Sequence, residues 1–154
     1  VVLGIEDEAQ LRSAYAGMSM RLGNDVLVSS MADAGVEMLL GIKHDPQFGP
    51  VVLIGSGGVL AETLGDVQFA LPPFDAAHAR RCVDRLQLRP LLDGVRGKAP
   101  ADIDAFCRMA AQFSEMAAAL GDVLGEADVN PVIVQKRGAV AVDALVTGRI
   151  AEGG

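Results

Sequence analysis

The sequence contains few aromatic residues and has a deficit of positive charge. It has no Trp, one Tyr and five Phe, and its 20 acidic residues outnumber its 13 basic ones, giving a formal net charge of −7. Proteins that bind nucleic acid usually offer a basic surface and aromatic side chains on which bases stack. We therefore expect no nucleic-acid partner. A nucleotide is not excluded, because Mg²⁺ and a glycine-rich backbone can supply the positive field that phosphates need.

Long hydrophobic runs and closely spaced cysteines are also lacking. No apolar run approaches the roughly 18 residues of a membrane-spanning helix, so no membrane partner is expected. The N-terminus, VVLGIEDEAQ, has neither the basic region nor the cleavage site of a secretory signal. Cys82 and Cys107 have neither metal-ligand nor CxxC spacing. These features favour a cytoplasmic protein with reduced thiols. The chain begins at Val1, within a predicted strand, and we expect it to be an excised part of a longer protein.

Residues 126–145, EADVNPVIVQKRGAVAVDAL, predict a β-hairpin. The runs 129–134 and 139–145 are rich in Val, Ile and Ala, and the polar loop QKRG between them contains a glycine. Two β-rich runs around a short glycine-containing loop are typical of antiparallel strands. The simplest register pairs Val134 with Ala139.

This register brings oxygen-bearing side chains together on one face of the hairpin. It places Asn130 directly opposite Asp143, with Cβ atoms about 4.5–5.5 Å apart. Asp128 points to the same face, because side chains in a strand repeat with period two. Asp143 lies within an apolar run, where burying an unpaired carboxylate costs several kcal/mol. It could therefore lie at a frayed strand end or pair with an Arg, but three converging oxygen donors favour a Mg²⁺ site.

The apolar periodicity along the chain predicts alternating strands and helices. Predicted strands cover Val1–Ile5, Asp25–Met31, Val36–Lys43 and Pro50–Ile54, with further strand or short helix at Val59–Gly65 and at Val67–Leu71. Predicted helices run from the acidic residues 6–8 to Leu22, from an Asp75 N-cap onward, and over about Asp102–Leu124. We expect an α+β fold in a single domain, residues 1–154, with helices packed on a mixed, mostly antiparallel sheet.

Two features on these strands admit more than one interpretation. Glu37 and Lys43 lie on one face of the same strand, either as ordinary charges on a solvated face or as part of a ligand site. The segment Gly55-Ser56-Gly57-Gly58 follows a strand, where it could form a tight turn or bring N–H groups close to a phosphate. It is neither a Walker A loop nor a GxGxxG motif, because Leu60 occupies the place of the last glycine.

Three segments together resemble the ATP-grasp domain of NDP-forming acyl-CoA synthetases, and more distantly that of the succinyl-CoA synthetase β-subunit. The segments are GVEMLLGIKHDPQFGPVVLIGSGGVLAETLGDV, PLLDGVRG and EADVNPVIVQKRGAVAVDA. The resemblance extends from about Val1 to Val146 and covers the later part of the ATP-grasp module. It implies that the upstream nucleotide-binding subdomain, the CoA-binding domain and the ligase domain lie elsewhere, in the same protein or in a partner subunit.

The resemblance also implies roles for individual residues. Asn130 and Asp143 match the Mg²⁺ ligands, and Asp128 matches an acidic position that steadies a phosphohistidine loop. Glu37 matches a glutamate that contacts the nucleotide, ATP or ADP. Ser29 stands where the adenine-contacting hinge of the family often has Glu.

The Gly-Gly loop of the family corresponds to Gly57 and Gly58, near a phosphate or a swinging partner segment. Neither His44 nor His78 matches a phosphorylated-histidine motif, so we assign no catalytic histidine. The implied reaction converts acyl-CoA, phosphate and NDP reversibly into a carboxylic acid, CoA and NTP. Assembly into a homo-oligomer is left open.

Two other functions fit the same sequence. The same module occurs in fused protein acetyltransferases, where the synthetase-like part is regulatory, and an acetyltransferase domain after Gly154 would identify that arrangement. A non-catalytic interaction module with a degenerate site is the other alternative. The joint presence of Glu37, Asp128, Asn130 and Asp143 argues against it.

Overall fold

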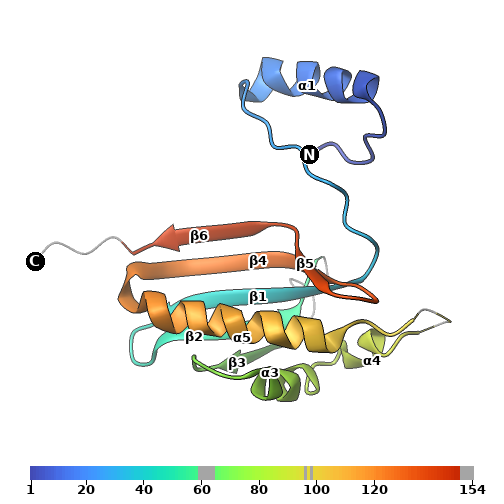
Figure 1. Cartoon of the computed structure of the whole chain (residues 1–154). Coiled ribbons are helices and arrows are strands. Elements are labelled where there is room, and N and C mark those ends of the chain that lie inside the picture. Colours follow the sequence, from blue (N-terminus) through green and yellow to red (C-terminus); the bar gives the residue numbers. More distant parts are fainter. Residues whose placement is uncertain (59–64, 96, 98, 150–154) are drawn as a thin grey trace, which may run out of the picture. The chain divides into compact units, whose positions relative to one another are not determined.

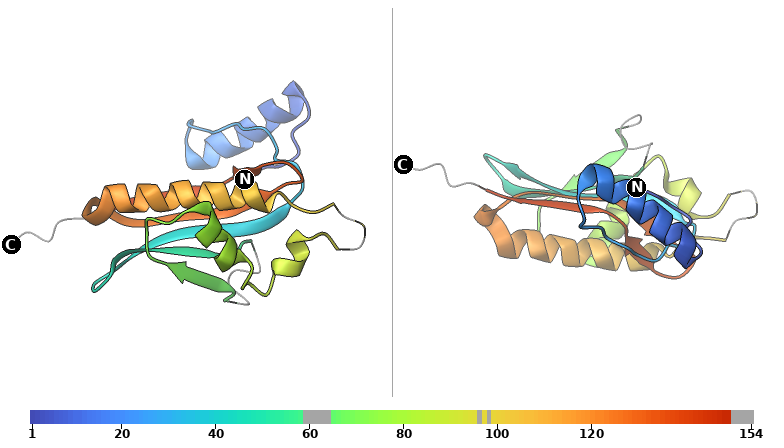
Figure 2. Two further views of the ribbon diagram at one scale, coloured as in Figure 1. Left: turned by 60° about the horizontal axis from the view of Figure 1, so that its bottom comes forward. Right: turned by 90° about the horizontal axis from the view of Figure 1, so that it is seen from above.

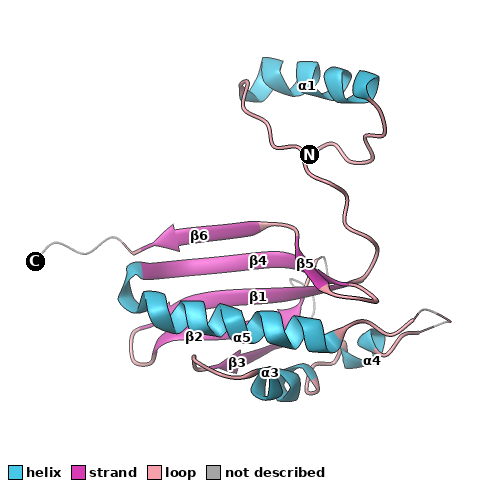
Figure 3. Ribbon diagram, viewed as in Figure 1, coloured by secondary structure: helices cyan, strands magenta, loops and turns pink. Residues whose placement is uncertain are grey.

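The computed structural model describes residues 1–58, 65–95, 97 and 99–149, so the element predicted at Val59–Gly65 lies, except for its last residue, outside the described residues. The contacts within the chain divide it into two compact units, Val1–Asp33 and Ala34–Gly154. The single domain expected for residues 1–154 stays a prediction, and the first 33 residues form a contact unit of their own. Figure 3 shows that this first unit is built from a helix and loops and that the second contains the sheet.

The first unit consists of one helix with extended segments on either side. Helix α1 spans Glu8–Leu22. Its N-cap is Asp7, whose carboxylate accepts a hydrogen bond from Gln10 N at 2.8 Å. It ends at Gly23, which adopts a φ of 100° that is open to glycine but costly for other residues. The predicted helix is therefore confirmed, although none of its residues is buried.

The two strands predicted for the first unit are wrong. Residues 1–33, all of which the structure describes, contain no strand. Val1–Ile5 and Asp25–Met31 carry β-branched residues, but a strand requires a hydrogen-bonded neighbour, and neither segment has one among the described residues. Their apolar side chains remain in solvent, with Leu3 70% and Leu27 94% exposed.

The second unit contains a six-stranded sheet with the order β3-β2-β1-β4-β5, and β6 also pairs with β4 (Figure 1). All of these pairings are antiparallel. The strands are β1 Val36–Asp45, β2 Gly49–Ser56, β3 Val67–Ala70, β4 Leu124–Val134, β5 Ala139–Ala141 and β6 Ala144–Gly148. Both β5 and β6 come from the second half of the predicted hairpin, which the residues around Asp143 interrupt.

Helices cover one face of this sheet, as the two views of Figure 2 show. They are α3 Ala76–Val83 and α5 Ile103–Leu120, which continues into the 3-10 turn η1 Gly121–Val123; the short helix α4 Arg89–Leu92 lies between them in the chain. Asp75 caps α3 as predicted, accepting from His78 N at 2.7 Å. The long predicted helix is confirmed, with the turn η1 as its last residues.

The core lies between the helices and one face of the sheet. Alternate residues of β1 point into it, as the period-two pattern predicted: Met38, Leu40 and Ile42 are at most 2% exposed. Facing them on the helix side is Phe106 of α5, which is 1% exposed. The odd-numbered residues of β1, including Glu37 and Lys43, therefore point to the opposite face.

The α+β prediction, with helices on a mostly antiparallel sheet, is confirmed. Among the described residues, no helix is long and apolar enough to cross a bilayer.

Candidate functional site

The predicted register of the hairpin is confirmed. Val134 pairs with Ala139, and the same register continues through β6, where Val129 pairs with Ala144. Between these two stretches the Asn130 N–H donates to the carbonyl oxygen of Asp143 at 3.2 Å. Asn130 and Asp143 therefore lie opposite each other across an antiparallel pair, as the sequence indicated.

A β-bulge sets Asn130 apart from the regular strand. The pairing of β1 with β4 shifts between Met38, which faces Val132, and Leu40, which faces Val129. Asn130 and Pro131 thus occupy the space opposite a single residue of β1. Bulges redirect side chains and often lie next to functional sites. Here the bulge lies at the residue for which the sequence predicts metal binding.

Three carboxylates gather near Asn130. Glu126 and Asp128 lie two residues apart on β4, and Asp143 lies across the hairpin. Partial burial raises the pKa of Asp128, and the nearby charges of Glu126 and Asp143 raise it further. Carboxylates that disfavour one another's ionisation create a negative potential, which a cation would relieve. The donor set therefore suits a hard cation such as Mg²⁺.

Asp143 is exposed and lies in the break between β5 and β6. This agrees with the expectation that an unpaired carboxylate in this apolar run would lie at a strand end and not in the core. Among the described residues, no Lys, Arg or His forms a salt bridge with its carboxylate.

The glycine-rich loop after β2 lies against the same end of the sheet. The Gly58 N–H donates to Asn130 Oδ1 at 3.0 Å, and the Gly57 N–H donates to the Glu37 carbonyl oxygen at 3.0 Å. The Glu37 carboxylate contacts the position where a side chain of residue 58 would begin. The structure thus brings together Glu37, Gly57, Gly58 and Asn130, which lie in three separate parts of the sequence.

The group of oxygen ligands would not be complete from the protein alone. Within the described ranges, no three His, Cys, Asp or Glu side chains are arranged to hold a metal ion. A cation near Asp128 and Asp143 would need the Asn130 carboxamide and further ligands from outside the chain. Mg²⁺ commonly takes such ligands from phosphates and water.

The sequence analysis missed Glu126 as a member of this group. It lies two residues before Asp128 on the same strand, and its charge helps to raise the pKa of Asp128. Lys43 of β1 pairs directly with Glu126, so one positive charge lies opposite this carboxylate across the strand pair. The alternation in EADVN, with oxygen-bearing side chains at every second position, would have been sufficient to identify it.

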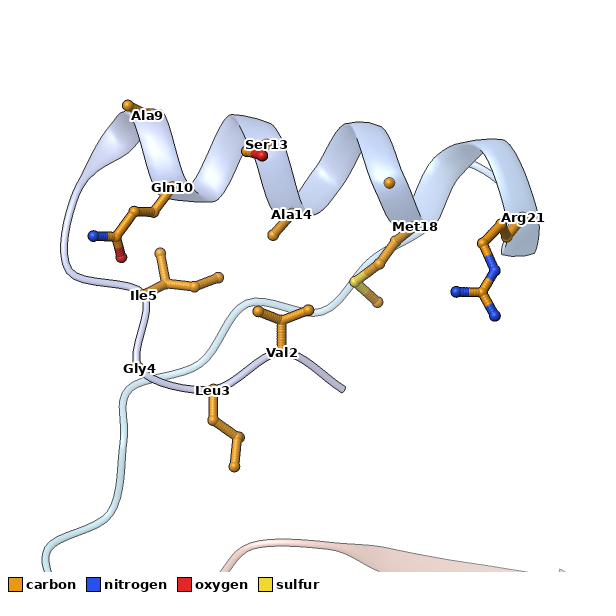
Figure 4. A pocket seen from close by; sticks show the side chains of 11 residues that line it. Val2, Leu3, Gly4, Ile5, Ala9, Gln10, Ser13, Ala14, Met18 and Arg21 are labelled. Atoms are coloured by element: carbon orange, nitrogen blue, oxygen red, sulfur yellow. The ribbon is translucent and has the colours of Figure 1, made fainter.

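Ser29 lies in the first unit, where its residue is exposed, and not in the unit that carries the other predicted site residues. The first unit also contains a pocket of about 680 Å³ between the N-terminal segment and α1. Figure 4 shows that Val2 and Ile5 point toward the helix and that Met18 points back toward Val2. Its lining is mostly apolar and does not include Ser29.

Comparison with known proteins agrees with this arrangement. Residues 1–147 match the model of an ATP-grasp domain. The chain is 39% identical to the β-subunit of ADP-forming acetate–CoA ligase II from Pyrococcus furiosus, over 79% of this chain and 52% of that protein. It is 42% identical to ADP-forming acetate–CoA ligase I from Archaeoglobus fulgidus, over 77% of this chain and 17% of that protein. The chain therefore spans about half of the first of these relatives and a smaller part of the second.

A solved structure is similar over almost the whole chain. It is the dinucleotide-forming acetyl-coenzyme A synthetase 1 from Ca. Korarchaeum cryptofilum, in complex with coenzyme A and Mg-AMPPCP, with a phosphohistidine segment pointing towards the nucleotide-binding site. The TM-score is 0.88 at 32% identity, covering 96% of this chain and 67% of that one. The resemblance to NDP-forming acyl-CoA synthetases found in the sequence is thereby confirmed. The chain belongs to the ATP-grasp domain family, and the two relatives named above are ADP-forming CoA ligases.

Proposed function

We propose that this chain is the nucleotide- and Mg²⁺-binding part of an NDP-forming acyl-CoA synthetase. Such an enzyme converts acyl-CoA, phosphate and NDP into a carboxylic acid, CoA and NTP. The observation that carries the proposal is the convergence of the Gly57–Gly58 loop, Glu37 and Asn130 beside Asp128 and Asp143. The CoA-binding and ligase domains belong to the same protein or to a partner subunit.

The residues divide the work by their chemistry. The Asn130 carboxamide and the Asp143 carboxylate would hold Mg²⁺, which when bound neutralises charge on the terminal phosphates of the nucleotide. Glu37 would accept hydrogen bonds from the nucleotide, and the backbone at Ser29 would be the contact to adenine that the family makes at its hinge. Asp128 would steady a phosphohistidine segment, a role supported by the segment named in the similar solved structure. Phosphoryl transfer depends mainly on such positioning and charge neutralisation.

The metal assignment can be tested by replacing Asp143 with Asn in the full-length protein. The change removes one negative charge and keeps the size of the side chain, and Asp143 is exposed, so folding should be little affected. Mg²⁺-dependent turnover should fall by far more than the melting temperature. A variant with unchanged Mg²⁺ dependence would refute Asp143 as a ligand.

The nucleotide assignment can be tested by calorimetry on Glu37→Ala. Loss of a hydrogen bond to a charged group costs about 1.5–3 kcal/mol, which corresponds to a roughly 10- to 150-fold weaker nucleotide affinity. Glu115→Ala is the matched control, because Glu115 is an exposed glutamate on α5. Equal nucleotide affinity in both variants would return Glu37 to an ordinary charge on a solvated face.

A further inference from the structure

The side-chain oxygen of Asn130 faces a backbone group of the glycine-rich loop. Gly58 N–H donates to Asn130 Oδ1 at 3.0 Å, across 72 positions of sequence. Because the partner is a donor, the oxygen and not the NH₂ of the carboxamide must face the loop. A carboxamide oxygen has two lone pairs, so accepting this bond leaves one for a cation. The loop therefore determines which atom Asn130 can offer to a metal.

The loop can approach Asn130 only because its glycines have no side chains. A Cβ on Gly57 would overlap the Met38 carbonyl group, lying 2.6 Å from its carbon. This contact is with backbone, which a rotamer change cannot relieve. The Gly57 N–H donates to the Glu37 carbonyl at 3.0 Å, so the loop is fixed directly on β1.

Gly58 has a separate reason to be glycine. Its φ is +60°, and a Cβ there would overlap Glu37 Oε2 and lie 2.9 Å from Glu37 Cδ. The Glu37 carboxylate therefore lies in the space that a side chain of residue 58 would take. Gly58 thus contacts both the residue proposed to bind nucleotide and the residue proposed to bind metal.

We propose that Gly58 is a positioning residue that couples Glu37 to Asn130. Its N–H orients the Asn130 carboxamide oxygen, and its lack of a side chain allows the Glu37 carboxylate to lie beside it. The proposal rests on the proposed function, in which Glu37 contacts nucleotide and Asn130 holds Mg²⁺. It differs from the view that these glycines serve only to let a phosphate approach the loop. In that view a substitution at Gly58 would act independently of Glu37.

The test is a double-mutant cycle with Gly58→Ala, Glu37→Ala and the double variant. Gly65→Ala is the matched control: Gly65 has a φ of +56° and no atom within 4 Å of the added Cβ. It therefore reproduces the backbone strain of Gly58→Ala without the overlap with Glu37. Thermal unfolding of each variant reports whether it folds.

Nuclear magnetic resonance gives a readout that does not depend on activity. In Gly58→Ala, the side-chain amide signals of Asn130 should shift, and hydrogen exchange at the residue 58 amide should accelerate several-fold. Both should stay unchanged in Gly65→Ala. Adding Glu37→Ala to Gly58→Ala should restore most of the wild-type signals, because the overlapping carboxylate is gone. Unchanged Asn130 signals in Gly58→Ala, or no recovery in the double variant, would overturn the proposal.

A Mn²⁺ titration monitored by water-proton relaxation, with ADP present, provides the binding readout. Gly58→Ala should weaken Mn²⁺ binding about tenfold, whereas Gly65→Ala should leave it unchanged. Equal Mn²⁺ affinity in the two variants would overturn the coupling. A full-length wild-type protein that bound neither Mn²⁺ nor ADP would refute the proposed function, and the resonance cycle would still decide whether Gly58 positions Asn130. If Gly58→Ala does not fold, the double variant should fold, and its failure to fold would also count against the proposal.

Discussion

The tight approach of the glycine-rich loop to β1 gives a stability prediction for Gly57→Ala. The added methyl would overlap the Met38 carbonyl group, so the loop must move away from the strand. Overpacking of this kind costs about 1–3 kcal/mol. The movement also breaks the 3.0 Å hydrogen bond from Gly57 N–H to the Glu37 carbonyl, at a net cost of about 0.5–1.5 kcal/mol. Gly57 is not among the glycines with positive φ, so no backbone strain is added.

The expected loss in the free energy of unfolding is therefore about 1.5–4.5 kcal/mol, a large part of the roughly 5–15 kcal/mol typical of a domain. Urea denaturation followed by circular dichroism measures it. Gly41→Ala is the matched control, because Gly41 is also buried in the sheet but its Cβ would meet its nearest neighbour, Leu53 Cβ, at an ordinary 3.4 Å. The reasoning fails if Gly57→Ala and Gly41→Ala lower stability by the same amount.

Three further predictions concern the buried groups of the second unit. Asp66 is 5% exposed, and its carboxylate accepts hydrogen bonds of 2.9 Å from two backbone N–H groups in the segment after α3. Asp66→Ala should therefore lower the free energy of unfolding, measured by urea denaturation, by about 2–5 kcal/mol, and Asp66→Asn should lower it less. Fully buried Ser114 exchanges hydrogen bonds with the backbone of Phe74, so Ser114→Ala should cost about 1–3 kcal/mol, whereas a neutral effect would show that water replaces the hydroxyl. Burial raises the pKa of Cys107 to about 11, so its thiol should react with Ellman's reagent at pH 8 only after unfolding, and rapid reaction of the folded protein would contradict this.

The second unit could largely be predicted because its signals are local. The hairpin follows from two β-rich runs around one short loop, and a single pairing, Val134 with Ala139, sets the position of every other residue in the register. The burial of alternate residues on β1 and the caps of α3 and α5 likewise depend on residues a few positions apart. For these elements the local pattern and the tertiary structure agree.

The remaining features depend on contacts that are distant in sequence. The bond from Gly58 to Asn130 joins two parts of the chain 72 residues apart, and no periodicity predicts it. The exposure of Asp143 goes with the break between β5 and β6, which the continuous apolar run around the residue does not reveal. The strands expected at Val1–Ile5 and Asp25–Met31 need neighbours that the described residues do not provide. Sequence patterns named most residues of the candidate site, whereas the fold determines how the loop orients Asn130 and Glu37.

Asp102 gives a prediction about pH, because its carboxylate joins helix α5 to the hairpin that carries the site. One oxygen accepts the Ala105 N–H at 2.9 Å as the helix cap, and the other accepts the Gly138 N–H in the hairpin turn at 2.9 Å. The bond from Gly138 has the larger effect and the bond from Ala105 the smaller, and together they hold the pKa of Asp102 below its usual range. A carboxyl group with a lowered pKa in the folded state stabilises the protein above its unfolded pKa, near 3.8, and loses that contribution as the pH falls through the folded value.

In Asp102→Asn only one of the two side-chain groups is an acceptor. If the oxygen caps the helix, the NH₂ group faces the N–H of Gly138; if the oxygen accepts from Gly138 instead, the helix cap is lost. The variant should therefore be less stable than wild type at pH 7, and the difference should shrink as the pH is lowered below about 4. Urea denaturation at pH 7, 5 and 3.5 measures this difference. Glu115→Gln on the same helix is the control, because Glu115 is exposed and should show little difference from wild type at any pH. A stability difference for Asp102→Asn that stays constant from pH 7 to 3.5 would mean that the charge of Asp102 does not hold the hairpin turn to the helix.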